Sequence, residues 1–362
     1  MVEAQPEVYP LRVQPELHAR VWGGRRLAAV LDVPLPDGPI GESWSMGQAN
    51  RVLNGPWAGQ TLGQLVAAHP RALLGRTVLA GGRRDLPLLF KIIDANDLLS
   101  IQVHPDDHYA RTVEQAAFGK TEAWYVLDAA PGATVIHGFA RPVTAAEVVG
   151  GLGDGSITGL VRTLELRAGD SLLVPAGTVH AIGGGLLLAE IQENSDLTYR
   201  LYDWGRPRET HVEKSLAVLH PGPPGFAQSA PLEVATAGGT IRYLVACPYF
   251  AYQALAVQGT LSLDTAQRSF HILFGYGGAV TVGYGRGTVP LHSGQTILVP
   301  AALGAYTLDS AGGRVLRALV PDLHADVIAP LRAAGYAPAP IAALGGAPGN
   351  ELARLLAPAA HA

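Results

Sequence analysis

Cysteine is almost absent from this chain of 362 residues, in which Cys247 is the only one. A single thiol cannot form an intrachain disulfide, so the sequence indicates a reducing compartment, and we expect the cytoplasm. Charged residues are also scarce, at 15% with a net charge of -4, which gives no reason to expect nucleic acid or an acidic membrane as a partner. The N-terminal segment lacks the pattern of a signal peptide, and no run is long and apolar enough to span a bilayer.

Lysine is also scarce. Of 26 basic residues only three are lysines, Lys91, Lys120 and Lys214, and the other 23 are arginines. A compact ammonium group can fill roles that a planar guanidinium cannot, so these three lysines are candidates for functional residues. Two of the three lysines lie in the polar segments described below.

Short strands dominate what is present. Apolar or alternating segments separated by turns with Gly or Pro predict strands at Leu86–His104 (broken by a turn at Asn96–Asp97), Ala123–Leu127, Ala133–Phe139, Leu160–Leu166, Ser171–Val174, Leu186–Glu193 and Leu197–Trp204. Capping patterns predict only short helices, at Thr61–His69, from Pro105 to about Ala117, and after the box Thr144–Glu147. Residues 1–55 are expected to form strands and turns without a helix. Many short strands with few helices indicate an antiparallel sandwich or barrel.

An internal repeat supports two domains, which the length also favours. The segment from Leu166 to Ile182 aligns without gaps on the segment that starts at Leu291, so that Gly169 falls on Gly294, Pro175 on Pro300 and His180 on Ala305. The same strand, turn and strand occur twice, but only the first copy ends in a potential metal ligand. Residues 221–230, PGPPGFAQSA, are the best linker candidate.

Three separated segments carry polar side chains that suit a metal. The first, residues 91–104, ends in a predicted strand in which alternate positions on one face carry Ser100, Gln102 and His104. The second, GKTE at residues 119–122, adds a carboxylate, and the third, GDSLLVPAGTVH at residues 169–180, ends in another imidazole. An amide, two imidazoles and a carboxylate suit a divalent metal of borderline softness, zinc above all.

These motifs also carry a resemblance. The pattern G-x5-P-x-G-x2-H at residues 169–180 resembles the second motif of cupin barrels, whereas the first cupin motif, usually His-x-His, is replaced by Q-x-H-P-D at residues 102–106. Together with GKTE, the stretch EIQENSDLTYRLYDW at residues 190–204, and WGG and GESW near the N-terminus, this order resembles the short bacterial form of class I mannose-6-phosphate isomerases. The resemblance covers residues 20 to 220 most strongly.

The resemblance implies an all-β fold of two cupin-like, jelly-roll barrels with short helical additions. Its domains are a catalytic, metal-binding one at residues 1–225, a second without metal ligands at residues 226–325, and an Ala/Pro-rich tail at residues 326–362. The implied activity is the interconversion of mannose 6-phosphate and fructose 6-phosphate through an enediolate, with one zinc ion per chain. The implied metal ligands are Gln102, His104, Glu122 and His180; the implied catalytic residues are Arg200, Glu190 and Lys120; and Lys91 and Ser100 are implied to bind the phosphate.

Plainer explanations stay open for several of these residues. Gln102 can hydrogen-bond to a water rather than bind zinc, Glu122 can pair with Lys120, and Glu190 can orient Arg200. The remaining histidines and tryptophans singled out, His108, His137, His211, His271, Trp124 and Trp204, are expected to have structural roles. Two other functions also remain open: a different metal-dependent cupin enzyme, such as an oxygenase or epimerase, and a sugar-binding cupin without turnover. We expect a small phosphosugar as the partner, and a monomer or small homo-oligomer.

Overall fold

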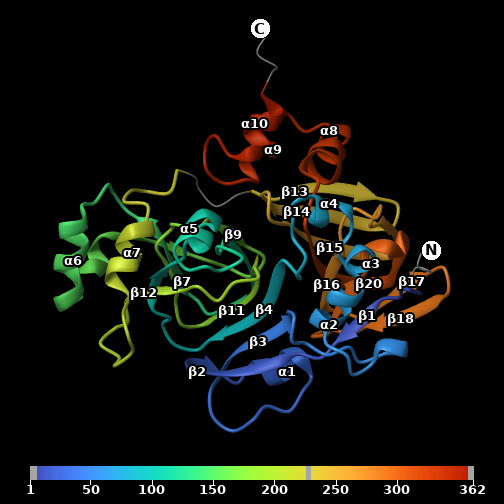
Figure 1. The fold of residues 1–362 in the computed structure, drawn as a ribbon, viewed down its shortest axis with the longest axis horizontal. Helices are drawn as coiled ribbons and strands as arrows, with labels where there is room; N and C mark the ends of the chain where they lie inside the picture. The colour runs from blue at the N-terminus through green and yellow to red at the C-terminus, as the bar shows by residue number, and fades with distance from the viewer. Residues whose placement is uncertain (1–5, 226–229, 358–362) are drawn as a thin grey trace.

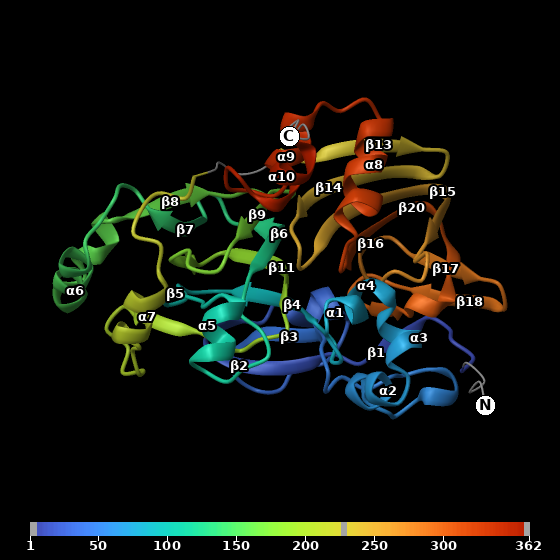
Figure 2. The same cartoon turned by 45° about the horizontal axis from the view of Figure 1, so that its top comes forward.

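The computed structural model describes residues 6–225 and 230–357, which form two β-barrels side by side (Figures 1 and 2). Two sheets build the first barrel. The six-stranded sheet has the order β2 (Glu16–Gly24), β3 (Ile40–Met46), β4 (Leu88–Ala95), β11 (Leu186–Glu193), β6 (Glu122–Ala129), β9 (Ser171–Val174). The five-stranded sheet has the order β12 (Tyr199–Tyr202), β5 (Ile101–Val103), β10 (His180–Ile182), β7 (Thr134–Phe139), β8 (Val161–Glu165).

A nine-stranded sheet builds the second barrel. Its main path is β1 (Leu11–Val13), β19 (Thr296–Val299), β16 (His271–Gly277), β20 (Ala305–Leu319), β15 (Ala251–Asp264), β14 (Gly239–Ala246), β13 (Leu232–Thr236), with β17 (Val280–Tyr284) and β18 (Gly287–Leu291) beside it. The described pairings between strands are antiparallel, as β1 with β19 illustrates. Because β1 comes from the start of the chain, the N-terminal segment belongs to the second barrel before the chain enters the first.

The helices are short. The α-helices are α1 (Leu27–Leu31), α2 (Leu62–Ala68), α3 (Pro70–Leu74), α4 (Arg76–Ala80), α5 (Asp107–Thr112), α6 (Ala145–Asp154), α7 (Val212–Val218), α8 (Ala329–Ala333), α9 (Pro338–Ala343) and α10 (Glu351–Leu356). Single turns of other helix types are η1 (Gly55–Trp57), η2 (Ser156–Gly159), η3 (Ala301–Leu303) and η4 (Leu323–Ile328). In the described part of the chain, none of these helices has the length and apolar character needed to cross a membrane.

Most of the expected elements are present, and the predicted all-β fold class is confirmed. Thr61 and Thr144 both form complete capping boxes, at the starts of α2 and α6. The helix expected to reach Ala117 was wrong in length, since α5 ends at Thr112. The prediction of no helix in residues 1–55 was also wrong, because α1 forms there.

The sequence repeat corresponds to a structural repeat. Strand β9 begins at Ser171 and β19 at its aligned residue Thr296, and β10 begins at His180 where β20 begins at Ala305. The two aligned turn glycines both have left-handed backbones, with φ of +93° and +81°. Ala305 is exposed, so the second barrel offers no ligand at the position equivalent to His180.

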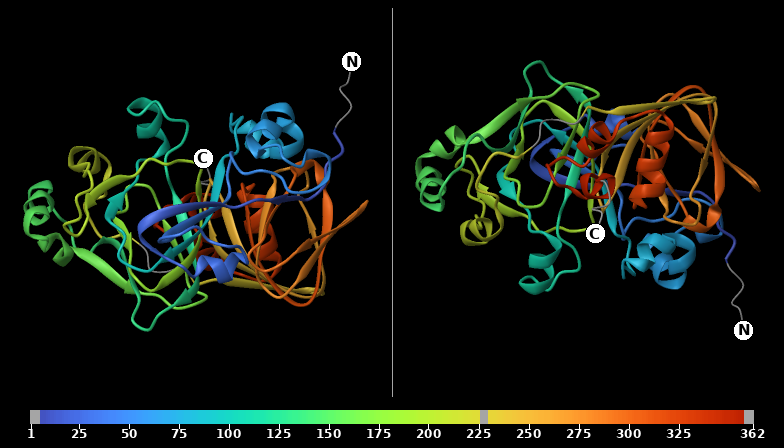
Figure 3. Two further views of the ribbon diagram at one scale, coloured as in Figure 1. Left: turned by 90° about the horizontal axis from the view of Figure 1, so that it is seen from below. Right: turned by 90° about the horizontal axis from the view of Figure 1, so that it is seen from above.

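The two barrels share an apolar core. Phe90 on β4 packs against Tyr252 and Phe274 of the second barrel, with ring centroids 6.4 and 5.4 Å apart. Helices α2 to α4, which precede β4 in the chain, lie beside the second barrel in both views of Figure 3, and the backbone N–H of Arg76 donates to the carbonyl of Gln267. The division of the chain near residue 225 stays a prediction, and residues 226–229 of the expected linker lie outside the described residues.

The C-terminal segment packs onto the second barrel. From η4 to α10 it is largely helical, and its buried apolar side chains join the second barrel's own core cluster. Figure 1 shows these helices above the nine-stranded sheet. The segment expected as a tail therefore has an ordered, packed part up to residue 357.

Candidate metal and substrate site

Three potential metal ligands from distant parts of the chain converge inside the first barrel. His104 follows β5, Glu122 begins β6 and His180 begins β10. One ligand atom from each lies within 4.8 Å of the others, and each residue is only 1% exposed. In the described part of the chain this is the one such group of acidic, His or Cys side chains.

Strand pairing explains the convergence. His180 is the direct cross-strand partner of Gln102 in the pair of β10 with β5, and Glu122 pairs with Val174 at the end of β9. Two glycines allow the loops to close. A Cβ on Gly119 would lie 2.3 Å from the carbonyl carbon of Asp106, and Gly177, with φ of +82°, would place one 2.7 Å from the His220 ring.

Both imidazoles are held in a ligand-competent orientation. The Nδ1 atoms lie 2.9 Å from the carbonyl of Leu197, for His104, and 2.8 Å from the carbonyl of Thr178, for His180. A carbonyl can only accept, so Nδ1 carries the proton in each ring and Nε2 keeps its lone pair. Those Nε2 atoms face Glu122, at 3.5 Å from Oε2 for His104 and 3.3 Å from Oε1 for His180.

The charges of these groups fit a cation site. Burial lowers the pKa of His104 to about 3, with the Lys120 ammonium adding to the effect, and burial also lowers the pKa of His180. Burial opposes the charge of Glu122, but Lys120 and the two imidazoles outweigh it and hold its pKa well below the usual range. Two neutral imidazoles and one ionised carboxylate are the forms in which these side chains bind a metal.

Gln102 and Lys120 complete this group. The Gln102 amide nitrogen lies 3.3 Å from His180 Nε2 and donates to its lone pair. Lys120 Nζ donates to Glu122 Oε2 at 2.5 Å and contacts His104 Nε2 at 3.0 Å. The ion pair between Lys120 and Glu122 that the sequence left open is thus present, and it lies among the potential ligands.

A polar cavity of about 270 Å³ opens beside the three buried potential ligands. Six of the nine site residues expected from the sequence line it: Lys91, Ser100, Gln102, Lys120, Glu190 and Arg200. The other three are the buried His104, Glu122 and His180. The structure therefore brings the whole expected set together around one cavity.

Comparisons with known proteins identify the family of this chain. The family model described as the type I phosphomannose isomerase catalytic domain matches residues 11–128, and that of the mannose-6-phosphate isomerase cupin domain matches residues 240–319. A mannose-6-phosphate isomerase of Streptococcus mutans is 35% identical over 315 residues, which cover 83% of this chain and 95% of the relative. The chain belongs to the type I mannose-6-phosphate isomerase family.

Two solved structures are also similar to this chain. The crystal structure of the mannose 6-phosphate isomerase from Bacillus subtilis has a TM-score of 0.76 at 31% identity and covers 86% of this chain and 99% of its own. A putative mannosephosphate isomerase from Archaeoglobus fulgidus has a TM-score of 0.68 at 26% identity, with 85% and 96% covered. The predictions of an enzyme, of this isomerase family and of cupin-like barrels are confirmed.

In this isomerase, Lys91 and Glu190 form a buried pair on adjacent strands. They are direct partners in the pairing of β4 with β11, and Lys91 Nζ lies 3.2 Å from Glu190 Oε1. Lys91 also donates to Gln192 at 2.6 Å, and Trp124 donates to Glu190 Oε2 at 3.1 Å. Burial raises the pKa of Glu190, with the Glu122 charge adding to it, whereas the carboxylates of Glu190 and Glu42 overcome burial and raise the pKa of Lys91.

Arg200 stands at the cavity wall with few bonds. It lies on β12 opposite Gln102, and its Nη1 donates to the carbonyl of Glu209 at 2.6 Å. Its buried Nε has no hydrogen-bond partner among the described residues. Burial and the neighbouring Arg208 lower the pKa of Arg200, because both disfavour its positive charge.

Some residues that line the cavity were given no role from the sequence. Glu42, Arg20 and Arg208 are among them. Arg20 donates to Glu42 through Nε and Nη2, at 3.1 and 3.0 Å. Burial opposes ionisation of Glu42, but Lys91 and Arg20 lower its pKa to about 2. The only signal in the sequence was the motif GESW, which includes Glu42 and contributed to the resemblance without a role for any of its residues.

A second network of hydrogen bonds and ion pairs, formed around the buried Glu193, holds the GKTE segment in place. Glu193 accepts from the backbone N–H of Thr121 at 3.1 Å, and Asp107 accepts from the N–H of Gly119 at 2.8 Å. Arg83 contacts both acidic side chains, at 3.3 Å from Glu193 and 3.4 Å from Asp107. These bonds hold Gly119 and Thr121, the two residues on either side of Lys120. No sequence pattern indicated this network, because its three charged members lie in separate segments.

The histidines expected to have structural roles lie elsewhere or contact backbone. His137 Nε2 lies 3.0 Å from the carbonyl of Leu173, and His271 contacts the Tyr306 hydroxyl at 2.7 Å inside the second barrel. His211 Nδ1 accepts from the backbone N–H of Arg200, and His108 is exposed on α5. None of the four lines the cavity.

Proposed function

We propose that this chain interconverts mannose 6-phosphate and fructose 6-phosphate at a single zinc ion through an enediolate. The observation that carries the proposal is the convergence of three buried ligand atoms next to a cavity lined with lysine, arginine and carboxylate side chains. Such a cavity suits a small anion that must be bound at one end and deprotonated at the other.

The donor set supports zinc. His104, His180 and Glu122 would hold the ion, with Gln102 as the fourth ligand through its amide oxygen. Two imidazoles and a carboxylate form a common protein set for zinc that is bound with a position free for substrate or water. When bound, zinc polarises substrate oxygens and so eases proton removal from the neighbouring carbon. Lys120 would then leave its bond to the ligand carboxylate and face the substrate.

We assign the proton transfer to Glu190. Moving the carbonyl between C1 and C2 requires a group that removes a proton at one carbon and returns it at the other. Burial raises the pKa of Glu190, so this carboxylate accepts a proton more readily than an exposed one. A group of this kind suits both the removal and the return of the proton. Arg200 and Lys120 would stabilise the negative charge of the enediolate, since fixed cations at that place need no solvent reorganisation.

Lys91 and Ser100 would bind the substrate phosphate. Both line the cavity, and Ser100 Oγ lies 3.4 Å from Gln102 Oε1, so the hydroxyl can be redirected at little cost. Holding the phosphate orients the reacting carbons and removes much of the entropic barrier. We expect Lys91→Ala to raise the KM for mannose 6-phosphate by about tenfold or more. A rise no larger than that caused by Arg332→Gln, on exposed α8, would end this assignment.

One assay tests the activity. Protein stripped of metal and refilled with zinc should form fructose 6-phosphate from mannose 6-phosphate and leave glucose 6-phosphate unchanged. Iron-dependent consumption of oxygen would instead favour the alternative of a different cupin enzyme. Sugar binding that survives Arg200→Ala, with no proton exchange at C2 in the unchanged protein, would favour a binding protein.

We also propose a compartment, an oligomeric state and a domain division for this chain. We infer that the chain acts in the cytoplasm as a monomer or small homo-oligomer, without nucleic acid or membrane partners. The lone cysteine supports a reducing compartment, because the chain cannot form an intrachain disulfide. We also propose the division into a catalytic domain at residues 1–225, a metal-free domain at residues 226–325, and a C-terminal segment that packs on the second.

A further inference from the structure

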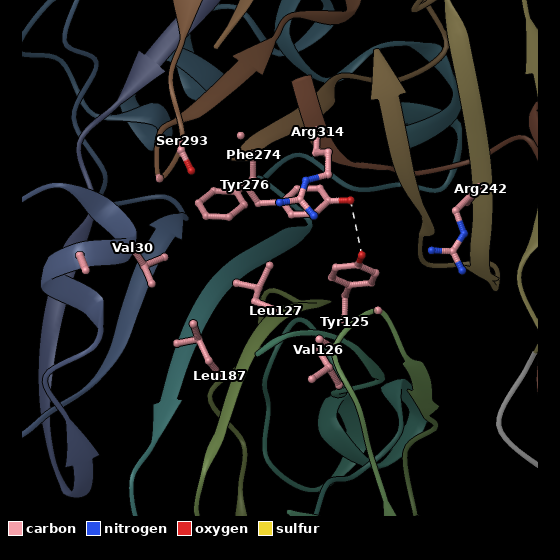
Figure 4. A pocket seen from close by; sticks show the side chains of 15 residues that line it. Val30, Tyr125, Val126, Leu127, Leu187, Arg242, Phe274, Tyr276, Ser293 and Arg314 are labelled. Carbon is pink, nitrogen blue, oxygen red and sulfur yellow. Dashed lines mark hydrogen bonds between the residues drawn. The ribbon is translucent and has the colours of Figure 1, made fainter. Parts of the chain in front are cut away.

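A second cavity, of about 450 Å³, lies between the two barrels (Figure 4). Strands β6 and β11 of the first barrel form one side, and β14, β16 and β20 of the second form the other. We call it the inter-barrel cavity. It shares no lining residue with the candidate active site. Binding in this cavity would be independent of the proposed activity.

The lining of the inter-barrel cavity is cationic. It includes Arg242 and Arg314 but neither aspartate nor glutamate. Within residues 6–225 and 230–357, no carboxylate pairs with Arg314, whose guanidinium stacks on Tyr276 at 5.1 Å from the ring centroid. Arg242 pairs with Glu233 at 3.0 Å, but the Glu233 side chain is 58% exposed, so water screens that pair. A net positive charge remains to attract an anion.

Two phenols add a hydrogen-bond donor. The hydroxyls of Tyr125 and Tyr276 lie 3.4 Å apart and face each other across the cavity in Figure 4. Only one of them can donate to the other, so one O–H hydrogen lacks an acceptor among the described residues. Tyr125 is only 5% exposed and Tyr276 is partly exposed, and the spare hydrogen lies at the cavity wall on either ring. An acceptor that enters the cavity would satisfy this donor.

Apolar side chains form the rest of the wall. Leu127, Leu187 and Phe274 line the cavity beside the phenols. Figure 4 shows Leu127 and Leu187 on the first-barrel side, below the stacked Arg314 and Tyr276. The volume falls within the range of cavities that bind small molecules. Cationic and hydroxyl donors at one place with an apolar surface beside them suit a molecule with an anionic head and a compact body.

We propose that the inter-barrel cavity binds a small organic anion, a phosphate monoester or a carboxylate carried on a ring or short apolar body. The head contacts the Arg314 guanidinium and the free tyrosine hydroxyl, and the body packs on Phe274 and the two leucines. Because its walls come from both barrels, such a ligand also stabilises their contact and raises the unfolding temperature of the protein.

Three aromatic probes test the proposal by titration calorimetry: phenyl phosphate, benzoate and the uncharged benzyl alcohol. We expect saturable binding of at least one anionic probe at one site per chain, and the comparison of the two identifies the preferred head. Charge-assisted hydrogen bonds carry the binding, so Arg314→Gln and Tyr125→Phe should each weaken it, by about tenfold or more for the arginine. Arg332→Gln, an exposed arginine on α8, is the matched control and should bind like the unchanged protein.

Several results would overturn the proposal. One is the absence of saturable binding by both anions. A second is binding that neither Arg314→Gln nor Tyr125→Phe weakens, which would place the probe elsewhere, including the candidate active site. A third is equal affinity for benzyl alcohol, which would show that charge plays no part. Arg314 is exposed and makes no ion pair with a described residue, so its substitution leaves the fold intact, and circular dichroism checks this.

Discussion

Glu193 gives the sharpest test of the physical reasoning. This carboxyl ends β11, is fully buried, and accepts the backbone N–H of Thr121 beside the candidate metal ligand. Burial, with Asp107 close by, raises its pKa to about 8. The folded protein therefore holds a proton on this residue at pH values where an unfolded chain has released it.

The sign of the effect follows from this proton. Between the ordinary pKa of 4.5 and the folded value of about 8, the folded state binds more protons than the unfolded state. The free energy of unfolding therefore falls as pH rises through this window, by up to about 1.4 kcal/mol per pH unit. Across the whole window Glu193 removes roughly 3 to 5 kcal/mol of stability, all of it still present below pH 4.5.

The substitution Glu193→Gln isolates this effect. Glutamine keeps an oxygen for the Thr121 N–H and offers an amide hydrogen to Asp107, but it does not titrate. Urea unfolding of both proteins at pH 5 and pH 8 should show the variant gaining roughly 3 kcal/mol relative to the unchanged protein between the two conditions.

The matched control is Glu213→Gln, an exposed carboxyl on α7, which should show the same difference at both pH values. If the Glu193→Gln difference is also independent of pH to within about 0.5 kcal/mol, the proton is not where we place it. The reasoning about burial would then fail for this network.

Three further outcomes are expected. His104→Asn should lose bound metal, measured by elemental analysis of purified protein, and with it the isomerase activity. Arg200→Ala should lower kcat by about 100-fold or more with an unchanged unfolding midpoint, because its Nη1 makes one bond, to a backbone carbonyl. Phe90→Ala, which removes a ring 1% exposed between the barrels, should cost about 3 to 5 kcal/mol in urea unfolding and leave KM largely unchanged.

The residues expected at the site could be found from the sequence because their signals are local. Alternation along one strand puts Ser100 and Gln102 on one face, and the turn PAGT directs His180 inward. The structure agrees with both, since His180 pairs directly with Gln102 across the sheet. Each of these relations joins residues close in sequence or a motif with a fixed shape, whereas the roles expected for Arg200, Glu190, Lys91 and Ser100 came from the family resemblance.

Other features depend on contacts that the sequence does not reveal. α5 was expected to continue to Ala117, but the chain must turn back to bring the Gly119 N–H to Asp107, and Gln115 takes a left-handed φ of +54° on the way. α1 is only five residues long, and the Arg26 before it bonds to the buried Asp94 through its backbone N–H and its side chain. In both cases tertiary contacts decide where a short helix ends or forms.

Glu42 was also not predicted as a site residue from the sequence. Its charge affects the pKa of Glu190, the candidate acid-base group. Glu42 and Glu190 both act on Lys91, and each carboxylate raises its pKa. The charge of Glu42 also raises the pKa of Glu190 directly. Glu122 differs because Lys120 bonds to it at 2.5 Å and two imidazoles adjoin it, so its pKa is lowered whereas that of Glu190 is raised.

Glu42→Gln should therefore lower the pKa of Glu190, since it removes one negative charge and leaves Lys91 to act on a single carboxylate. The acidic limb of the pH profile of kcat/KM, which reports the essential base of the free enzyme, should move to lower pH. Glu233→Gln, an exposed carboxylate of the second barrel, should leave that limb in place. A limb that stays fixed or moves to higher pH in Glu42→Gln would mean that a group other than Glu190 carries the proton.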